Sequence, residues 1–202
     1  GSVEATRGEA ILCSEPIAGL SRETIARSIA VVGADTALPF STRVDDLVAL
    51  GRIPHGRGPS GPTALDRERA AAALERVGAA HLATRDARTL STGERQLAFV
   101  ALGLAQETPI LALDEPTVHL DLRHRVAIAD LLASLADDAT ISGTRRTIVA
   151  IFHELDIVRE GFDRVLLVSG GRIAADGSPS EVLTAERIGA AWGIPVGRAA
   201  RL

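Results

Sequence analysis

The chain has 202 residues, a net charge of -4 at pH 7 and an apolar fraction of 46%, which fits one globular domain with a sizeable core. No apolar run approaches the roughly 20 residues that a membrane-spanning helix needs, so we expect any membrane association to be peripheral. The acidic balance gives no reason to expect a nucleic-acid partner. A single cysteine, Cys13, cannot form an internal disulfide, which favours a reducing cytoplasm.

The basic residues have an unusual composition. All 22 are arginine, and the chain contains no lysine. A P-loop needs a glycine-rich turn and a lysine that reaches the β- and γ-phosphates of a nucleotide. Neither GxxxxGK[ST] nor any lysine occurs in these residues, so they hold no P-loop (Walker A) motif.

The front of the chain is predicted to contain two strands and one short helix. Gly8–Leu12 and Ile29–Val32 have the pattern of strands, and Ser21–Arg27 that of one or two helical turns with Ser21 as the N-cap. Cys13 lies in or beside the first strand and is expected to be a small core residue.

Helices dominate the next part of the chain. A helix is expected from about Arg43 to Leu50, with Gly51 ending it and Pro54 preventing its continuation. The glycine- and proline-rich residues His55–Pro62 predict a surface loop. An amphipathic helix is expected over Asp66–Val77, followed by a short helix near His81.

Leu90–Asp121 holds two chemically important points that are separated by a helix and a strand. Ser91 can cap the helix, Glu94 can close a capping box, and Gly93 lets the backbone approach a ligand closely. Exposed N–H groups at the positive end of a helix suit a phosphate. The sequence therefore predicts a helix start that can meet an anion.

The second point follows a predicted buried parallel strand. Pro109 is expected to stop the helix, and Ile110–Leu113 is a continuous apolar run. Asp114 and Glu115 follow it, at the edge where open α/β sheets place their ligand chemistry. Further along, Thr147–Phe152 predicts another buried parallel strand, with His153 at its carboxyl end.

The rest of the chain is predicted to pack around these strands. Leu122–Ala136 is expected to be a long helix on the sheet. Val165–Val168 and Arg172–Ala175 predict a hairpin with a Gly-Gly turn.

Three motifs in this order resemble those of ABC-type ATPases. LSTGERQ at Leu90–Gln96 (the signature segment below) resembles the family's LSGGQ or LSGGE, with Thr92 in place of the usual first glycine. ILALDEP at Ile110–Pro116 resembles the Walker B strand with its following glutamate. HLD at His119–Asp121 resembles the D-loop, and His153 matches the switch histidine. The resemblance extends from Gly8 to about Val196.

The resemblance implies an α/β fold, the P-loop NTPase-like ABC nucleotide-binding domain, with a mainly parallel sheet, an antiparallel β portion and an inserted helical subdomain. Residues 1–202 would form one such domain whose N-terminal part is incomplete. Within it, 3–33 would be a remnant of the N-terminal β portion, 34–89 the helical subdomain, and 90–202 the part with the signature helix, Walker B, switch histidine and C-terminal hairpin. We expect the P-loop to have been removed from the front.

The resemblance also implies roles for individual residues. Asp114 would hold Mg²⁺ through water, and Glu115 would orient or deprotonate the attacking water. His153 would contact the γ-phosphate. The remaining candidates would meet an ATP bound to the opposite subunit: Ser91, Thr92, Gly93, Glu94 and Asp121. The alternatives without a ligand are a polar turn after a strand for Asp114 and Glu115, and an ordinary capping box for Ser91–Glu94.

The segment PFSTRVDDLVALGRIPH at Pro39–His55 resembles the ATP-binding subunits of importers for iron–siderophore, haem and cobalamin. This implies ATP and Mg²⁺, a second ABC subunit, transmembrane permease subunits, and a place on the cytoplasmic face of the membrane. Ala34 stands where the family has its Q-loop glutamine. We therefore keep two hypotheses: a truncated importer ATPase that is inactive alone, or a non-catalytic partner that donates its signature and D-loop in trans. The sequence LGRIPH at Leu50–His55 disfavours a third possibility, an ABC protein that works without membrane subunits.

Overall fold

The structure is a computed structural model that describes residues 5–34, 38–56, 61–137 and 145–200. Residues 57–60 of the loop predicted between His55 and Pro62 lie outside the described residues. The helices and strands run in the order β1 Ile11–Leu12, β2 Glu15–Pro16, η1 Ile17–Gly19, α1 Arg22–Ser28, β3 Ile29–Val32, α2 Val44–Ala49, η2 Leu50–His55, α3 Ala64–Arg76, η3 Ala80–Leu82, η4 Ala87–Thr89, α4 Thr92–Ala105, β4 Ile110–Asp114, α5 Leu122–Asp137, β5 Thr147–Ile151, α6 Leu155–Gly161, β6 Val165–Ser169, β7 Arg172–Gly177, α7 Pro179–Val182, α8 Ala185–Trp192 and α9 Val196–Ala199.

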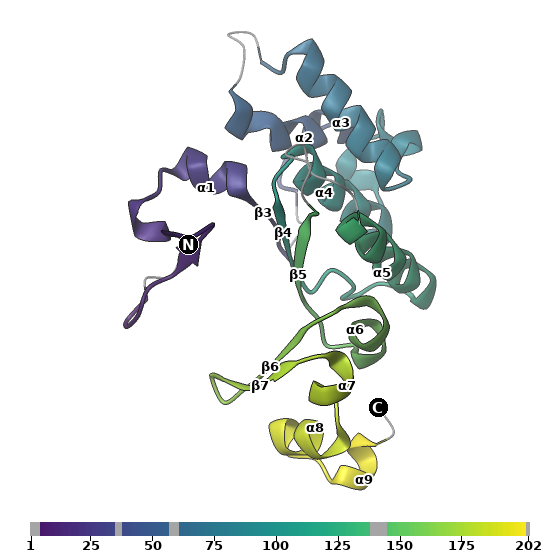
Figure 1. The fold of residues 1–202 in the computed structure, drawn as a ribbon. Helices are drawn as coiled ribbons and strands as arrows, with labels where there is room; N and C mark the ends of the chain where they lie inside the picture. The colour runs from purple at the N-terminus through teal and green to yellow at the C-terminus, as the bar shows by residue number, and fades with distance from the viewer. Residues whose placement is uncertain (1–4, 35–37, 57–60, 138–144, 201–202) are drawn as a thin grey trace.

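The centre of the molecule is a three-stranded parallel sheet in the order β3-β4-β5. Residues alternate between its two faces, and one face packs into the main core with α4 and α5 (Figure 1). Ala30 and Val32 of β3 and Leu111 and Leu113 of β4 are buried on this face. The predicted strands at 29–32 and 110–113 are therefore confirmed.

The opposite face of the sheet is open. Val31, Val149 and Ile151 on it are 67%, 53% and 55% exposed, and Figure 1 shows the N-terminal segment running away from the strands. The prediction that Thr147–Phe152 is buried is wrong for this face, because no described element packs over it. Parallel sheets are usually covered on both faces, so the exposed apolar surface is a notable feature of this chain.

The helical segment between β3 and α4 differs from prediction after its first helix. Helix α2 buries Val44, Leu47 and Val48 as expected, but the chain continues into η2 through Pro54. The α-helix ends at Ala49, close to the predicted Leu50, and Gly51 lies inside η2. A Cβ there would lie 2.3 Å from the Leu102 carbonyl oxygen, so the glycine lets η2 pack closely against α4.

A buried arginine joins this helical segment to the end of α4. Arg52, 5% exposed, donates from Nη1 to the Ala105 carbonyl at 2.8 Å and to Glu107 Oε2 at 2.5 Å. Its Nε donates to Asp66 Oδ1 at 3.4 Å. Because each charge is paired, the cost of burying the arginine is offset, and α2, α3 and α4 keep a fixed arrangement.

The N-terminal predictions are confirmed only in part. Ser21 caps α1 by accepting the Thr24 N–H at 3.0 Å. The strand predicted from Gly8 is limited to β1, which pairs with β2 across a tight turn. Cys13 lies in that turn with a φ of 51° and is exposed, so the prediction that it is a core residue is wrong.

The C-terminal part forms a second, smaller core. Strands β6 and β7 pair as a hairpin, and Gly170 and Gly171 at its tip have φ of 56° and 72°, the left-handed values that a type I′ turn requires. The inner face of the hairpin packs with α7, α8 and α9. The predicted hairpin is therefore confirmed. In the described part of the chain, no helix is long and apolar enough to cross a membrane.

Two adjacent valines of β3 test the open face of the sheet. We expect Val31→Thr to change the free energy of unfolding by no more than about 0.5 kcal/mol. Val32→Thr, 3% exposed, buries a hydroxyl and should cost about 1–3 kcal/mol. Urea unfolding of the two variants measures both, and equal losses would contradict the open face.

Candidate functional site

The carboxyl edge of the sheet brings three of the predicted site residues together. In the β4–β5 register Asp114 lies opposite Ile151, and the Glu115 N–H donates to the Ile151 carbonyl at 3.1 Å. His153 follows two residues after Ile151, and its Nε2 lies 2.7 Å from Glu115 Oε1. The parallel pairing of the two strands thus places the glutamate and the histidine in direct contact.

This pair has the geometry of a carboxylate oriented by an imidazole. An ionised carboxylate only accepts hydrogen bonds, so His153 donates from Nε2 to Glu115. The side chains are 32% exposed for Glu115 and 72% for His153, which leaves both open to a ligand from solvent. A carboxylate held in this way can accept a proton from a water within hydrogen-bond reach.

Two residues at this edge have uncommon backbone conformations. Glu115 has a φ of 48° and His119 a φ of 61°, in the left-handed region that side chains other than glycine rarely adopt. Such conformations cost free energy and tend to occur at functional sites. Here they turn the chain sharply after β4 and lead it into α5.

Asp114 is a chemically suitable ligand for Mg²⁺. Its carboxylate is exposed at the end of β4, and Mg²⁺ commonly keeps several waters and takes one or two carboxylates together with substrate phosphates. Among the described residues there is no group of three or more acidic, histidine or cysteine side chains placed to hold a metal. One exposed carboxylate is a suitable ligand for a Mg²⁺ ion that keeps most of its waters.

The signature segment begins α4 with a complete capping box. Ser91 Oγ accepts the Glu94 N–H at 3.3 Å, and Glu94 Oε2 accepts the Ser91 N–H at 2.8 Å. The Ser91 N–H and then its hydroxyl lower the pKa of Glu94, and the nearby Arg85 guanidinium adds to this effect. The predicted helix start is confirmed, with Ser91 and Thr92 exposed.

The D-loop residue Asp121 reaches the signature segment through a histidine. Asp121 Oδ1 lies 2.8 Å from His124 Nδ1 and accepts the His124 N–H at 2.9 Å. These two bonds lower the pKa of Asp121, the backbone N–H first. The His124 ring in turn lies against Gly93. No pattern in the sequence around His124 indicates this contact.

A second set of contacts fixes the loops around the sheet edge. Thr117, 1% exposed, donates to Glu154 Oε2 at 3.1 Å, and Arg125 Nη1 lies 3.7 Å from Glu154 Oε1. Arg125 also donates from Nε to the Leu120 carbonyl at 2.8 Å. Glu154 therefore ties the histidine loop to the loop after β4, a role that its position next to His153 could have suggested.

The predicted residues thus form two groups. Asp114, Glu115 and His153 lie at the sheet edge, while Asp121 and the signature segment meet through His124. Among the described residues, no hydrogen bond or ion pair joins the two groups directly. Ala34 is exposed just after β3, at the same edge as Glu115.

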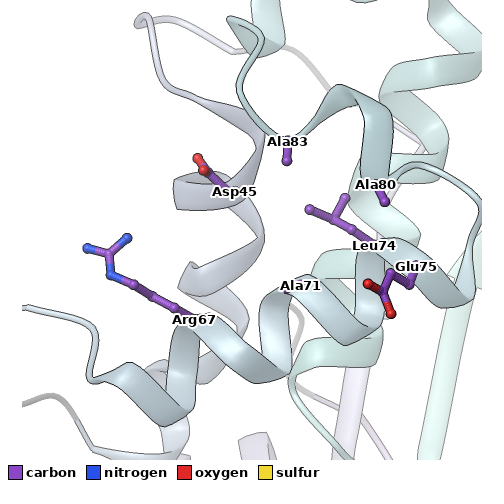
Figure 2. A pocket seen from close by; sticks show the side chains of 7 residues that line it. All are labelled: Asp45, Arg67, Ala71, Leu74, Glu75, Ala80 and Ala83. Atoms are coloured by element: carbon purple, nitrogen blue, oxygen red, sulfur yellow. The ribbon is translucent and has the colours of Figure 1, made fainter.

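A hollow in the molecule lies on the helical segment, and none of its lining residues belongs to either group. It has a volume of about 320 Å³ and is formed by α2, α3 and the chain around η3 (Figure 2). Its lining residues are Asp45, Arg67, Ala71, Leu74, Glu75, Ala80 and Ala83.

The chain is similar to proteins of one family. The sequence profile described as "ABC transporter" matches residues 1–118. The "Cobalamin import ATP-binding protein BtuD" of Halobacterium salinarum is 36% identical over 195 residues, which cover 95% of this chain and 46% of that protein. The "Ferric enterobactin transport ATP-binding protein FepC" of Escherichia coli is 34% identical over 187 residues, covering 93% and 67%. The chain thus spans less than half of one of these relatives and about two thirds of the other.

A solved structure agrees with these matches. An inward-facing transporter described as a metal-chelate type ABC transporter superposes with a TM-score of 0.75 at 31% identity. The match covers 83% of this chain and 64% of that one. The architecture predicted from the motifs, an α/β fold of the ABC nucleotide-binding type, is therefore confirmed.

The capping box makes stability depend on pH. Because the pKa of Glu94 is lowered in the folded protein, its stabilisation is complete above the unfolded pKa of about 4.3 and is lost as pH falls through the folded value. Glu94→Gln can still close the box but carries no charge. We expect the loss of unfolding free energy between about pH 7 and about pH 3 to be smaller in this variant than in the wild type.

Urea titrations at the two pH values provide the measurement. Exposed Glu160→Gln in α6 is the matched control and should leave the pH-dependent loss close to that of the wild type. An unchanged pH dependence in Glu94→Gln would show that the capping carboxylate is not stabilised in the fold.

Proposed function

The chain belongs to the ABC transporter family, and from this premise we propose that it acts as an ATP-binding subunit of an importer. Its cargo would be an iron–siderophore, haem or a related chelate, the kind of cargo named for the relatives that match it. The observation that carries the proposal is the 2.7 Å contact between Glu115 and His153 at the carboxyl edge of a parallel sheet.

Hydrolysis of ATP needs a water held in line with the bond between the γ-phosphorus and the leaving oxygen. In our proposal Glu115 orients that water and accepts its proton, while His153 keeps the carboxylate in place and faces the γ-phosphate. Mg²⁺ near Asp114 would neutralise phosphate charge. Thr117 and Arg125 hold Glu154, and thereby the loop that carries His153.

The signature segment supplies a second surface. The exposed start of α4, a helix of 14 residues, presents backbone N–H groups, a positive helix end and the hydroxyls of Ser91 and Thr92, all suited to phosphate. We propose that this start and Asp121 meet an ATP held by another subunit. A lysine that cradles the phosphates must come from outside these 202 residues, which contain none.

A second candidate function is that of a non-catalytic partner. Ala34 lies at the same sheet edge as Glu115 and offers only a methyl group, so it cannot hold a water or Mg²⁺ there. Such a chain would act only by donating its signature segment and Asp121 in trans. The intact Glu115–His153 pair favours the catalytic assignment, because a donor of this kind needs neither side chain.

The hollow on the helical segment supports a permease partner. Leu74 forms an apolar floor, and Asp45, Arg67 and Glu75 stand around it (Figure 2). A hollow with an apolar floor and a charged rim resembles the core and rim of a protein interface. We propose that a transmembrane permease subunit docks here and holds the chain on the cytoplasmic face of the membrane.

Calorimetry with Mg-ATP tests the nucleotide part of the proposal. The chain alone should give no binding heat at millimolar nucleotide, because no lysine-bearing loop holds the phosphates. The second arm mixes the chain with an ABC subunit that has a P-loop lysine but a disabled signature serine, a pair called the hybrid dimer below. ATP turnover in the mixture should then depend on this chain.

The variant Ser91→Ala identifies the contributing surface. It should lower turnover of the hybrid dimer roughly tenfold or more, the scale for losing one donor to a developing phosphate charge. Exposed Ser180→Ala in α7 is the matched control and should leave turnover unchanged. Micromolar binding of Mg-ATP by the chain alone, or turnover indifferent to Ser91, would contradict the proposal.

Substitution in the hollow tests the permease contact. Ala83→Trp places a large ring in the hollow and should reduce co-purification of the chain with permease subunits. Ala174→Trp, at an exposed position of β7, is the control and should have no effect. Equal recovery of the permease with both variants would exclude docking at this hollow.

A further inference from the structure

We propose that His124 is a positioning residue that fixes the distance between the signature glycine Gly93 and the D-loop carboxylate of Asp121. The inference rests on the proposed function, in which both motifs meet one nucleotide on another subunit. It concerns a side chain that neither the P-loop nor the Walker B chemistry uses.

The contact between His124 and Gly93 is unusually close. A Cβ on Gly93 would lie 2.5 Å from His124 Cδ2, 2.8 Å from Cγ and 2.9 Å from Nε2, closer than carbon atoms pack in proteins. Gly93 lies inside α4 without a positive φ, so its backbone conformation does not require glycine. The imidazole ring requires it, because any side chain would collide with that ring.

Asp121 fixes the orientation of the ring. Its Oδ1 accepts from both Nδ1 and the backbone N–H of His124, at 2.8 Å and 2.9 Å. The carboxylate therefore caps the first turn of α5 and selects the proton-bearing Nδ1. Asp121, His124 and Gly93 form a chain of contacts from the D-loop to the signature segment, called the His124 bridge below.

The residues on both sides of the bridge are themselves held. Arg125, the next residue of α5, binds the Leu120 carbonyl and lies near Glu154. On the other side, Arg95 Nη2 donates to the Leu90 carbonyl at 3.1 Å, and Glu94 is bound to Ser91 and Arg85. Because the residues beside Gly93 and beside Asp121 are both held, the imidazole ring sets the distance between Gly93 and Asp121.

The His124 bridge has a use because, in the proposed function, the two motifs act on a nucleotide held by another subunit. Two motifs that must touch one nucleotide gain from a fixed relative position, because groups placed within a fraction of an ångström avoid the entropy cost of alignment. The His124 bridge would supply this position within one chain. A second subunit would then meet the signature segment and Asp121 as one surface.

A double-mutant cycle tests the contact. Gly93→Ala should lower the urea midpoint of unfolding, and the same substitution in His124→Ala should lower it by less than half as much, since the colliding ring is absent. Gly161→Ala, where a Cβ meets nothing within 4 Å, is the control and should have the same effect in both backgrounds. Additive effects at Gly93 would overturn the proposal.

Nuclear magnetic resonance tests the bridge without changing Gly93. One Hα of Gly93 points where the Cβ would stand, toward the ring, so its resonance should carry a ring-current shift. His124→Ala should abolish that shift, whereas His124→Phe should keep it. An Hα resonance that does not move in His124→Ala would overturn the contact even if Gly93→Ala fails to fold.

Turnover of the hybrid dimer tests the positioning role. His124→Ala should lower turnover about fivefold or more, and His124→Phe, which keeps a ring against Gly93 but cannot donate to Asp121, should restore only part of it. Unchanged turnover in His124→Ala would overturn that role. If the wild-type mixture itself shows no turnover, the proposed function fails, while the cycle and the Gly93 resonance still decide whether the bridge exists.

Discussion

Parallel pairing of β4 with β5 is the interaction on which the rest of the structure depends. It aligns the carboxyl ends of the two strands, so that Glu115 and His153 meet at 2.7 Å although they lie 38 residues apart in the chain. After β4 the left-handed backbone at Glu115 and His119 turns the chain into α5, which packs on the sheet and carries His124. Loss of the β4–β5 register would separate Glu115 from His153 and would at the same time displace the D-loop.

The molecule has two chemical surfaces, and among the described residues no hydrogen bond or ion pair joins them directly. One is the sheet edge with its acid–histidine pair, and the other is the capped start of α4 with Asp121 beside it. A protein that acts alone on one nucleotide would need both kinds of group around the same phosphate. In the proposed function each surface meets a nucleotide shared with another subunit, and the phosphate-binding lysine comes from outside these residues, which contain none. The open apolar face of the sheet is a surface that a further protein segment can cover.

Sequence reasoning succeeded where the physical rule was local. The capping box at Ser91 and Glu94 spans three residues, and the buried strand before Asp114 follows from a short apolar run, so both were predictable. The sequence could place Glu115 and His153 near each other, because the carboxyl ends of parallel strands meet at one edge of the sheet. The bridge from Gly93 to His124 was not, since it depends on which turns of two helices meet in space. Cys13 was misplaced because the strand ends in a turn that its residue types do not reveal.

Cross-linking measures the central claim, that the signature segment faces a nucleotide on another subunit, most directly. In a Cys13→Ser background, Thr92→Cys places a thiol at the exposed start of α4 without removing the cap at Ser91. The second chain is an ABC subunit with its P-loop lysine and a cysteine beside that loop. The account predicts a disulfide that forms with ATP and is weak without it. Equal cross-linking with and without ATP, or none at all, would contradict it.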